Sequence, residues 1–204
     1  MPKLFENGQV PGLYRRNFGS FRISTVHDGM LDTAFDHIIG LEHKKAETMH
    51  RAALLPTPPR LSTNCFVIER NDRIYLVDTG CGITVQNAGK QSAGLSALGI
   101  KPGDIDVVLM THLHSDHLGG LVDSSGTCLF PNAEILVHED ELNFWTEEAN
   151  FVNLGDDQRG LLCSQLRFLT HMQNKFELLV PVRLRQGFQW CRHPATRRAI
   201  QHGF

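Results

Sequence analysis

The stretch Leu109-Met110-Thr111-His112-Leu113-His114-Ser115-Asp116-His117-Leu118-Gly119-Gly120 indicates both the fold and the chemistry of this chain. It places four candidate metal ligands within six residues: His112, His114, Asp116 and His117. Three imidazoles and a carboxylate buried together without a cation would leave polar groups unpaired, which is costly. Imidazole nitrogen and carboxylate oxygen suit zinc, and they also suit iron or manganese. The stretch therefore predicts a metal site.

The residues before this cluster indicate where in the fold it lies. Residues 105–110 form a short apolar run with several β-branched members, which is typical of a buried strand. α/β proteins place their sites where such strands end. In extended chain, residues two apart point to the same side, so His112 and His114 can reach one ion together. The chain must then turn, and Asp116 and His117 would face a second ion position.

The rest of the chain alternates strand and helix patterns, as expected for the mixed α/β (α+β) class. Strands are expected over 21–26, 63–69, 73–78 and 134–138, with turns at 28–29 and 70–72. Helices are expected over 42–53, 95–99, 139–145 and 159–176, and the proline-rich residues 56–59 predict an extended loop.

Three residues near the cluster allow more than one interpretation. Asp78 either orients a ligand histidine or stabilises its own turn, and the sequence favours neither. Cys81 follows that turn and is interpreted as a packing residue, with a place near the metals as the alternative. His138 lies at a strand end and is interpreted as structural.

Composition narrows the class of protein. With 41% hydrophobic and 21% charged residues, the 204-residue chain is typical of globular proteins. A formal net charge of -2 gives no reason to expect nucleic acid or an anionic membrane as a partner. No apolar run approaches the length of a bilayer crossing, and the first residues lack a secretory pattern, so a cytoplasmic location is expected. The five cysteines are scattered and suggest no disulfide framework.

The run from Thr111 to Gly120 resembles the His-x-His-x-Asp-His signature of the metallo-β-lactamase superfamily. Two earlier parts of the chain resemble that family in order and spacing: the strand pair within residues 64–80, and the helix and turn within residues 95–106. Within the superfamily, the chain is most similar to the branch that contains N-acyl-homoserine lactonases and methyl parathion hydrolase. The resemblance covers residues 10–180.

The resemblance implies an αββα sandwich that binds two metal ions, zinc in the first instance. His112 and His114 would hold the first ion, and Asp116 and His117 the second. A hydroxide shared by the ions would attack a lactone, ester or phosphotriester, with Asp116 catalytic through proton transfer. The expected partner is a small-molecule substrate. In the family, the region before the first hairpin often shapes the substrate mouth or a homodimer contact; a plain surface connection is the alternative.

The chain departs from the family after the metal motif. The family completes its site with a Gly-His-Thr-Pro-Gly-His-like segment, a bridging aspartate and a last histidine, and the later histidines here stand in no such context. Residues 182–204 contain five arginines and no acidic residue. They are interpreted as a basic arm or as a tail translated out of frame. In a shifted frame, codons permitted for residues 191–204 can encode Pro-Ala-Pro-Gly-His-Thr-Pro-Gly-His-Thr-Ala-Trp.

Three segments are therefore expected. An N-terminal extension covers residues 1–20, and an incomplete metallo-β-lactamase domain covers 21–181, with the N-terminal half of the sandwich and its helices present and the second half truncated. An atypical basic tail covers 182–204. Because each ion would keep an incomplete set of protein ligands, metal affinity is expected to fall.

Three functions stay open at this point. The first is a metal-dependent hydrolase of the lactonase-like branch, impaired by truncation. The second is a catalytically inactive zinc-binding fragment or pseudoenzyme. The third keeps the fold but uses iron, as in the sulfur-dioxygenase or flavodiiron branches.

Overall fold

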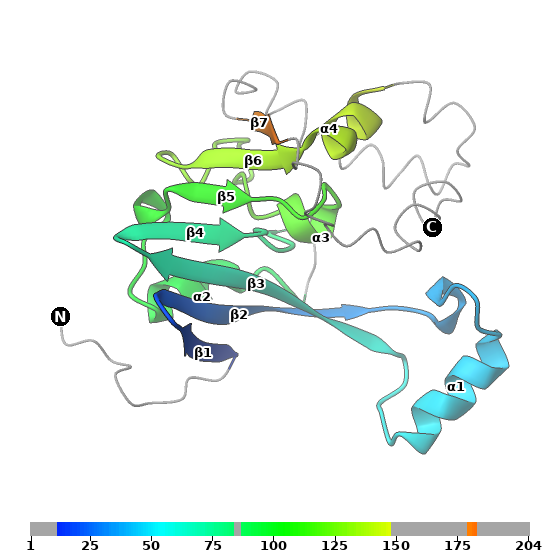
Figure 1. Cartoon of the computed structure of the whole chain (residues 1–204). Coiled ribbons are helices and arrows are strands. Elements are labelled where there is room, and N and C mark those ends of the chain that lie inside the picture. Colours follow the sequence, from blue (N-terminus) through cyan, green and yellow to red (C-terminus); the bar gives the residue numbers. More distant parts are fainter. Residues whose placement is uncertain (1–11, 84–86, 148–178, 183–204) are drawn as a thin grey trace.

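The computed structural model describes residues 12–83, 87–147 and 179–182, and its described strands form one sheet of seven (Figure 1). The strands are β1 (Leu13–Phe18), β2 (Phe21–Asp32), β3 (Arg60–Arg70), β4 (Arg73–Val77), β5 (Val107–Leu109), β6 (Glu134–His138) and β7 (Leu179–Val182). The helices are α1 (His43–Ala52), α2 (Gln91–Ala97), α3 (Ser115–Leu118) and α4 (Glu139–Thr146), with short 3-10 turns η1 (Phe35–His37) and η2 (Pro102–Asp104).

The sheet has an antiparallel half and a parallel half. The strands follow the order of the chain, β1 to β4 pair antiparallel, and β4 to β7 pair parallel. Parallel neighbours need a crossover connection, and α2 lies in the connection between β4 and β5. The carboxyl ends of β4, β5 and β6 therefore meet at one edge of the sheet, next to α3 (Figure 1). The expected mixed α/β class is confirmed.

The hairpin between β3 and β4 forms as the sequence predicts. Asn71 and Asp72 have φ angles of 48° and 60°. Two successive residues with positive φ are the requirement of a type I′ turn, whose twist matches that of the flanking strands. The turn fixes the register in which Arg70 faces Arg73 and Phe66 faces Val77. Register in turn determines which side of β4 faces the core.

The strand before that hairpin differs from expectation. The turn predicted at Asp28 and Gly29 is wrong: β2 continues to Asp32, and its pairing with β3 shifts register between His27 and Gly29. An extra residue in one strand bends it and re-aims a side chain without ending the strand. The bulge places the Asp28 side chain in the interior, with no exposed surface.

Residues 13–18 fall within the expected N-terminal extension, and they form a strand of the sheet. β1 pairs antiparallel with β2, from Leu13 opposite Val26 to Phe18 opposite Phe21. Its outward positions are exposed, so β1 covers the edge of β2 more than it adds to the core.

The core lies on the face of the sheet that α2 covers. Thr63, Cys65 and Val67 alternate with more exposed neighbours along β3, as expected for a strand with one buried face. Both Val107 and Val108 of β5 are buried, as in a parallel strand that is covered on both faces. The core also includes buried side chains of the metal motif, Leu113 and Leu118, and of the residues after it, Leu121 and Phe130.

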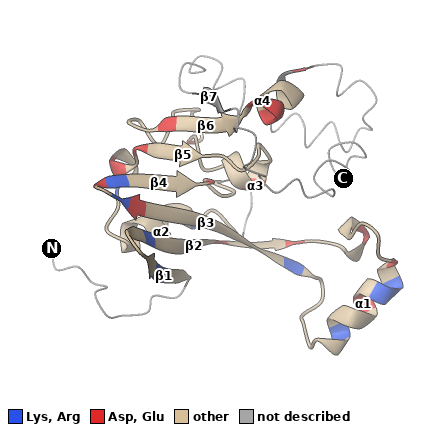
Figure 2. Cartoon of the chain, viewed as in Figure 1, with Lys and Arg blue, Asp and Glu red and all other residues tan. Residues whose placement is uncertain are grey.

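Residues 33–59, which we call the arm, join β2 to β3 and extend away from the sheet (Figure 1). The helix expected over 42–53 is confirmed as α1. Of its ten residues only Ala46 is buried, and its lysines and arginine, which colour parts of α1 blue in Figure 2, are exposed. The arm also exposes large apolar side chains: Ile38, Ile39, Met49, Leu54 and Leu55.

Several expectations concern residues that the structure does not describe. The helix expected over 159–176 and most of the basic tail, residues 183–204, lie outside the described residues, as does the segment 191–204. Among the described helices, none combines the length and apolarity that a bilayer crossing requires.

Candidate metal centre

The metal motif occupies the connection between β5 and α3. The Met110 N–H donates to the carbonyl oxygen of Leu136 (2.8 Å), which extends the pairing with β6 by one residue. The chain then bends at Thr111, and His114, the residue before α3, is extended, with φ and ψ of -74° and 155°. Asp116 and His117 lie in the single turn of α3. The change from extended chain to helix folds the motif back on itself.

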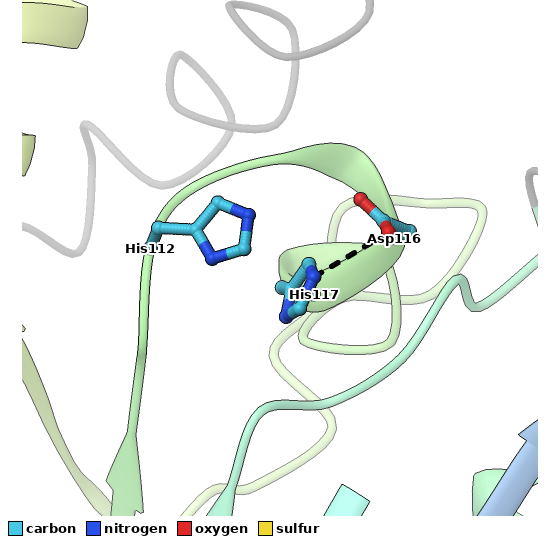
Figure 3. Close-up of side chains that lie close together, drawn as sticks. All are labelled: His112, Asp116 and His117. Carbon is cyan, nitrogen blue, oxygen red and sulfur yellow. Dashed lines mark ion pairs between the residues drawn. The ribbon is translucent and has the colours of Figure 1, made fainter. Parts of the chain in front are cut away.

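This turn brings three of the four predicted ligands together. One ligand atom from each of His112, Asp116 and His117 lies within 4.8 Å of the other two (Figure 3). The rings of His112 and His117 have centroids 3.9 Å apart. The ring of His114 lies next to that of His112, with centroids 4.6 Å apart, and it makes a T-shaped contact with the Trp145 ring at 5.6 Å. His114 is therefore adjacent to the group without belonging to it.

Two carboxylates bracket the ring of His117. Its Nδ1 donates to Asp78 Oδ2 (2.8 Å), and its Nε2 lies 3.4 Å from Asp116 Oδ2 (Figure 3). Asp78 is buried and also accepts from the backbone N–H of Thr111 at 2.8 Å. The sequence allowed Asp78 either to orient a ligand histidine or to stabilise its own turn. In the structure Asp78 contacts the candidate ligand His117 and the motif backbone at Thr111. Such contacts set the ring orientation and proton position of a metal-binding histidine.

The hydroxyl of Thr111 connects the ring of His112 with Asp78, the carboxylate that contacts His117. It lies 2.7 Å from Asp78 Oδ2 and 3.1 Å from His112 Nδ1. A carboxylate only accepts, so the single hydroxyl hydrogen is donated to Asp78, and His112 Nδ1 must then donate to the hydroxyl oxygen. A neutral imidazole has one N–H, so the lone pair of His112 is on Nε2. That lone pair is the one a cation would use.

The pKa values of the motif histidines shift in different directions. Burial, followed by the charges of His117 and His114, lowers the pKa of His112 to about 4. Burial also lowers the pKa of His114. Burial acts in the same direction on His117, but hydrogen bonds to Asp116 and Asp78 outweigh it and raise the pKa of His117 to about 9.

Asp116 completes this charge pattern. Burial raises its pKa, but the hydrogen bond and charge of His117 outweigh burial, and the net pKa is lowered. At neutral pH the group therefore consists of a neutral His112, an ionised Asp116 and a protonated His117. Separate protonation states in neighbouring groups are typical of functional sites.

The backbone behind α3 is in close contact with the segment that follows β4. The Thr79 N–H and hydroxyl both donate to the carbonyl oxygen of His117, at 2.7 and 2.9 Å, and the Gly120 N–H donates to the carbonyl oxygen of Gly80 at 3.1 Å. A Cβ at Gly120 would collide with the Thr79 carbonyl oxygen, and one at Gly82 with that of Gly119. Glycine is required here for close approach of two backbones.

The opposite side of the motif is held by α4. The Leu113 N–H donates to Glu141 Oε2 (3.1 Å), and the Trp145 indole N–H donates to the same oxygen (3.2 Å). The sequence predicted a helix over 139–145 but did not indicate this contact of Glu141. A carboxylate followed by tryptophan four residues later is the only local signal, since both then lie on one helix face.

The two remaining candidates have structural surroundings. Cys81 is fully buried, and burial followed by the charge of Asp28 raises the pKa of its thiol to about 12. Its Sγ lies 3.9 Å from the carbonyl oxygen of Asp116, so it is close to the motif as well as packed. His138 accepts from the Asp140 N–H (3.1 Å) and caps α4, which confirms its structural interpretation.

The donor set fits a divalent cation. Neutral imidazole and ionised carboxylate are ligands of zinc, iron and manganese, and the His112 lone pair and the Asp116 carboxylate converge. The buried Asp78 behind His117 is the partner that metal-binding histidines usually have.

Comparison with known proteins places the chain in a family. The model of the metallo-beta-lactamase superfamily matches residues 58–184, which is more than half of the chain. Metallo-beta-lactamase domain-containing protein 1 of Rattus norvegicus is 43% identical over 65 residues, which cover 32% of this chain and 22% of that protein.

Solved structures show the same fold. A hydrolase of the beta-lactamase superfamily, AbOPH, superimposes with a TM-score of 0.77 and 23% identity, covering 89% of this chain and 64% of that one. AidC, a dizinc quorum-quenching lactonase solved with its product, has a TM-score of 0.76 and 21% identity, covering 87% and 63%. A probable metal-dependent hydrolase of Staphylococcus aureus has a TM-score of 0.56 and 25% identity, covering 64% and 51%. The chain thus spans less than two thirds of each of these proteins.

Proposed function

Because the chain belongs to the metallo-β-lactamase superfamily, we propose that it acts as a metal-dependent hydrolase on a small lactone, ester or phosphotriester. The single observation that supports this best is the convergence of His112, Asp116 and His117 in front of the buried Asp78. The likeness in fold to AidC, a dizinc lactonase, supports zinc as the first metal to test and a lactone as the first substrate.

The four motif residues are proposed to divide between two ions. The rings of His112 and His114 are neighbours, with centroids 4.6 Å apart. Asp116 and His117 lie together on α3. Two ions would need further ligands beyond these four, since metal sites of this chemistry have at least three protein ligands each.

When bound, divalent ions supply Lewis-acid activation of a water molecule and of the substrate's carbonyl or phosphoryl oxygen. The protein's own residues prepare that chemistry. His112 is held neutral with its lone pair on Nε2. In the metal-free protein His117 Nε2 lies 3.4 Å from Asp116 Oδ2, and the proton on this nitrogen would have to leave before His117 could hold an ion. Asp116 Oδ2 is then available to accept a proton from the attacking water and to deliver it to the leaving group.

The experiment is metal loading followed by a substrate panel. The purified 204-residue chain is depleted of metal, loaded in turn with Zn²⁺, Mn²⁺ or Fe²⁺, and assayed on an N-acyl-homoserine lactone, an aryl ester and an aryl phosphotriester. We expect turnover that requires metal and is abolished by His112→Ala and by Asp116→Asn. Asp140→Asn, at an exposed carboxylate near the start of α4, is the control and should leave turnover unchanged.

The same panel separates two alternatives. A catalytically inactive metal-binding protein would bind Zn²⁺ through the same residues and show no turnover with any metal or substrate. An iron-dependent oxygen-using enzyme would consume dioxygen with Fe²⁺ only. A chain that binds none of the three metals would contradict the proposal itself.

A further inference from the structure

Asp28 is a fully buried carboxylate outside the metal motif. It lies at the bulge of β2, and its two oxygens accept three backbone hydrogen bonds. Oδ2 accepts from Cys81 N–H (2.9 Å) and Gly89 N–H (3.1 Å), and Oδ1 accepts from Gln91 N–H (2.9 Å). All three donors belong to the segment that runs from the end of β4 to the start of α2.

The burial of this group calls for an explanation. A carboxylate without exposed surface is costly unless its oxygens are fully hydrogen-bonded. The backbone is shaped around the carboxylate as well: Gly80 has a φ of 73°, and a Cβ at that position would collide with the Asp28 carboxyl group.

The segment bound by Asp28 is the same one that backs the metal motif. Directly before Cys81, Thr79 and Gly80 bind the backbone of α3 and its C-terminal end. The Cys81 thiol contacts the carbonyl oxygen of Asp116. One continuous backbone therefore contacts Asp28 on one side and the residues that hold Asp116 and His117 on the other.

We propose that Asp28 is a positioning residue for the metal centre: its carboxylate fixes the backbone at Cys81, and the adjoining Thr79 and Gly80 fix α3, which presents Asp116 and His117. The inference rests on the proposed metal site and adds a residue that is remote from it in sequence and whose hydrogen bonds within the described part of the chain go to Cys81, Gly89 and Gln91. The positioning role explains why Asp28 is buried although it takes no part in the proposed reaction with substrate.

Asp28→Asn tests the role with little change in volume. The amide nitrogen of asparagine would face either the Gln91 N–H or the pair from Cys81 and Gly89, and two donors cannot bond to each other. We expect Zn²⁺ affinity, measured by competition with a chromophoric chelator, to fall by about tenfold or more. We also expect the visible absorption spectrum of the Co²⁺-loaded variant to differ from wild type.

Asp106→Asn is the matched control. Asp106 is a partly buried aspartate that also accepts a backbone hydrogen bond, from Ile74 N–H at 2.7 Å, but it precedes β5 at the end of the strand opposite to the metal motif. We expect Asp106→Asn to lower the thermal midpoint of the metal-free protein while leaving Zn²⁺ affinity and the Co²⁺ spectrum unchanged. A merely structural role for Asp28 would give the same pattern in Asp28→Asn, and that result would overturn the inference.

Hydrogen exchange of the wild-type chain gives a test that needs no folded variant. We expect added Zn²⁺ to slow exchange of the Cys81, Gly89 and Gln91 amides, and to leave exchange of the Ile74 amide unchanged. Protection of α3 alone would overturn the inference. If the wild-type chain binds no Zn²⁺, the proposed function is wrong. If the wild-type chain binds Zn²⁺ and Asp28→Asn binds it equally tightly, only the inference about Asp28 is wrong.

Discussion

Two regions of the molecule are rich in histidine, and they use it differently. In the metal motif, His112, Asp116 and His117 turn their donor atoms toward one another. In the arm, each histidine has a separate partner: His43 Nδ1 bonds to Asp36 (2.6 Å), and His50 Nε2 bonds to the carbonyl oxygen of Pro56 (2.6 Å). Among the described residues, the arm histidines form no comparable donor group.

The difference lies in what surrounds the rings. The rings of His43 and His50 pack edge-on against Phe35, which separates them. The rings of the motif are backed by the buried Asp78 and by backbone that approaches within hydrogen-bond distance. Histidine density is therefore a weak sign of a metal site, and convergence in front of a buried polar partner is a strong one.

The largest expected effect comes from filling the space where two backbones meet behind the motif. Gly120→Ala would collide with the Thr79 carbonyl oxygen, so we expect a loss of about 3 kcal/mol in unfolding free energy and loss of Zn²⁺ binding. Gly40→Ala in the arm is the control. Gly40 has a φ of 83° with no atom within 4 Å of a Cβ, so its cost is limited to about 1 kcal/mol of backbone strain.

Urea denaturation and Zn²⁺ titration measure both glycine variants. Equal losses of stability in the two would contradict the contrast between a tightly packed motif and an open arm.

A smaller effect is expected from the two aspartates that pair with histidine. Asp78→Asn removes the charge behind His117, and asparagine tolerates the positive φ of 57° at this position. We expect Zn²⁺ affinity to fall by about tenfold to a hundredfold, as for other partners of metal-binding histidines. Asp36→Asn, which removes the partner of His43, should leave Zn²⁺ affinity unchanged. Similar losses from the two substitutions would show that the charge acts at long range.

The exposed apolar side chains of the arm lead to a third expectation. Leu54 and Leu55 are 93% and 52% exposed, so replacing both with serine should change the unfolding free energy by no more than about 0.5 kcal/mol each. A homodimer through the arm stays a prediction, and this double variant tests it. Sedimentation analysis should show a shift toward monomer, whereas Ile83→Ser, outside the arm and 74% exposed, should not shift the mass. A wild-type chain that sediments as a monomer would contradict the predicted homodimer.

The smallest effect is expected for the hydrogen-bonded pair of His43 and Asp36 in the arm. The hydrogen bond to Asp36, followed by its charge, raises the pKa of His43 above 6.5. A raised folded-state pKa adds stability that is present below the unfolded value and lost as the pH rises through the folded one. Because both side chains are well exposed, the shift should shrink in high salt. NMR titration of wild type and Asp36→Asn measures it, and an unchanged His43 pKa in the variant would show that the contact does not form in solution.

Local patterns in the sequence predicted much of the fold. The helix at α1, the strand at β6 and the turn at Asn71 and Asp72 all have local causes, because helix periodicity, strand alternation and positive-φ turn residues act over a few positions. The strand β1 was missed because its outward side chains are polar or exposed and give no core pattern. Asp28 and Gly29 were misinterpreted because a turn and a bulge use the same residue types.

The sequence by itself determined that His112, His114, Asp116 and His117 are candidate ligands, because their chemistry and their place after a buried strand are local properties. Only the tertiary structure decided that three of them converge, that Asp78 contacts His117, that Glu141 contacts the motif backbone at Leu113, and that Asp28 binds the backbone of Cys81. The reason is physical for the contacts of Asp78, Glu141 and Asp28: they join residues 28 to 53 positions apart, and nothing near either partner specifies the other until the sheet has formed.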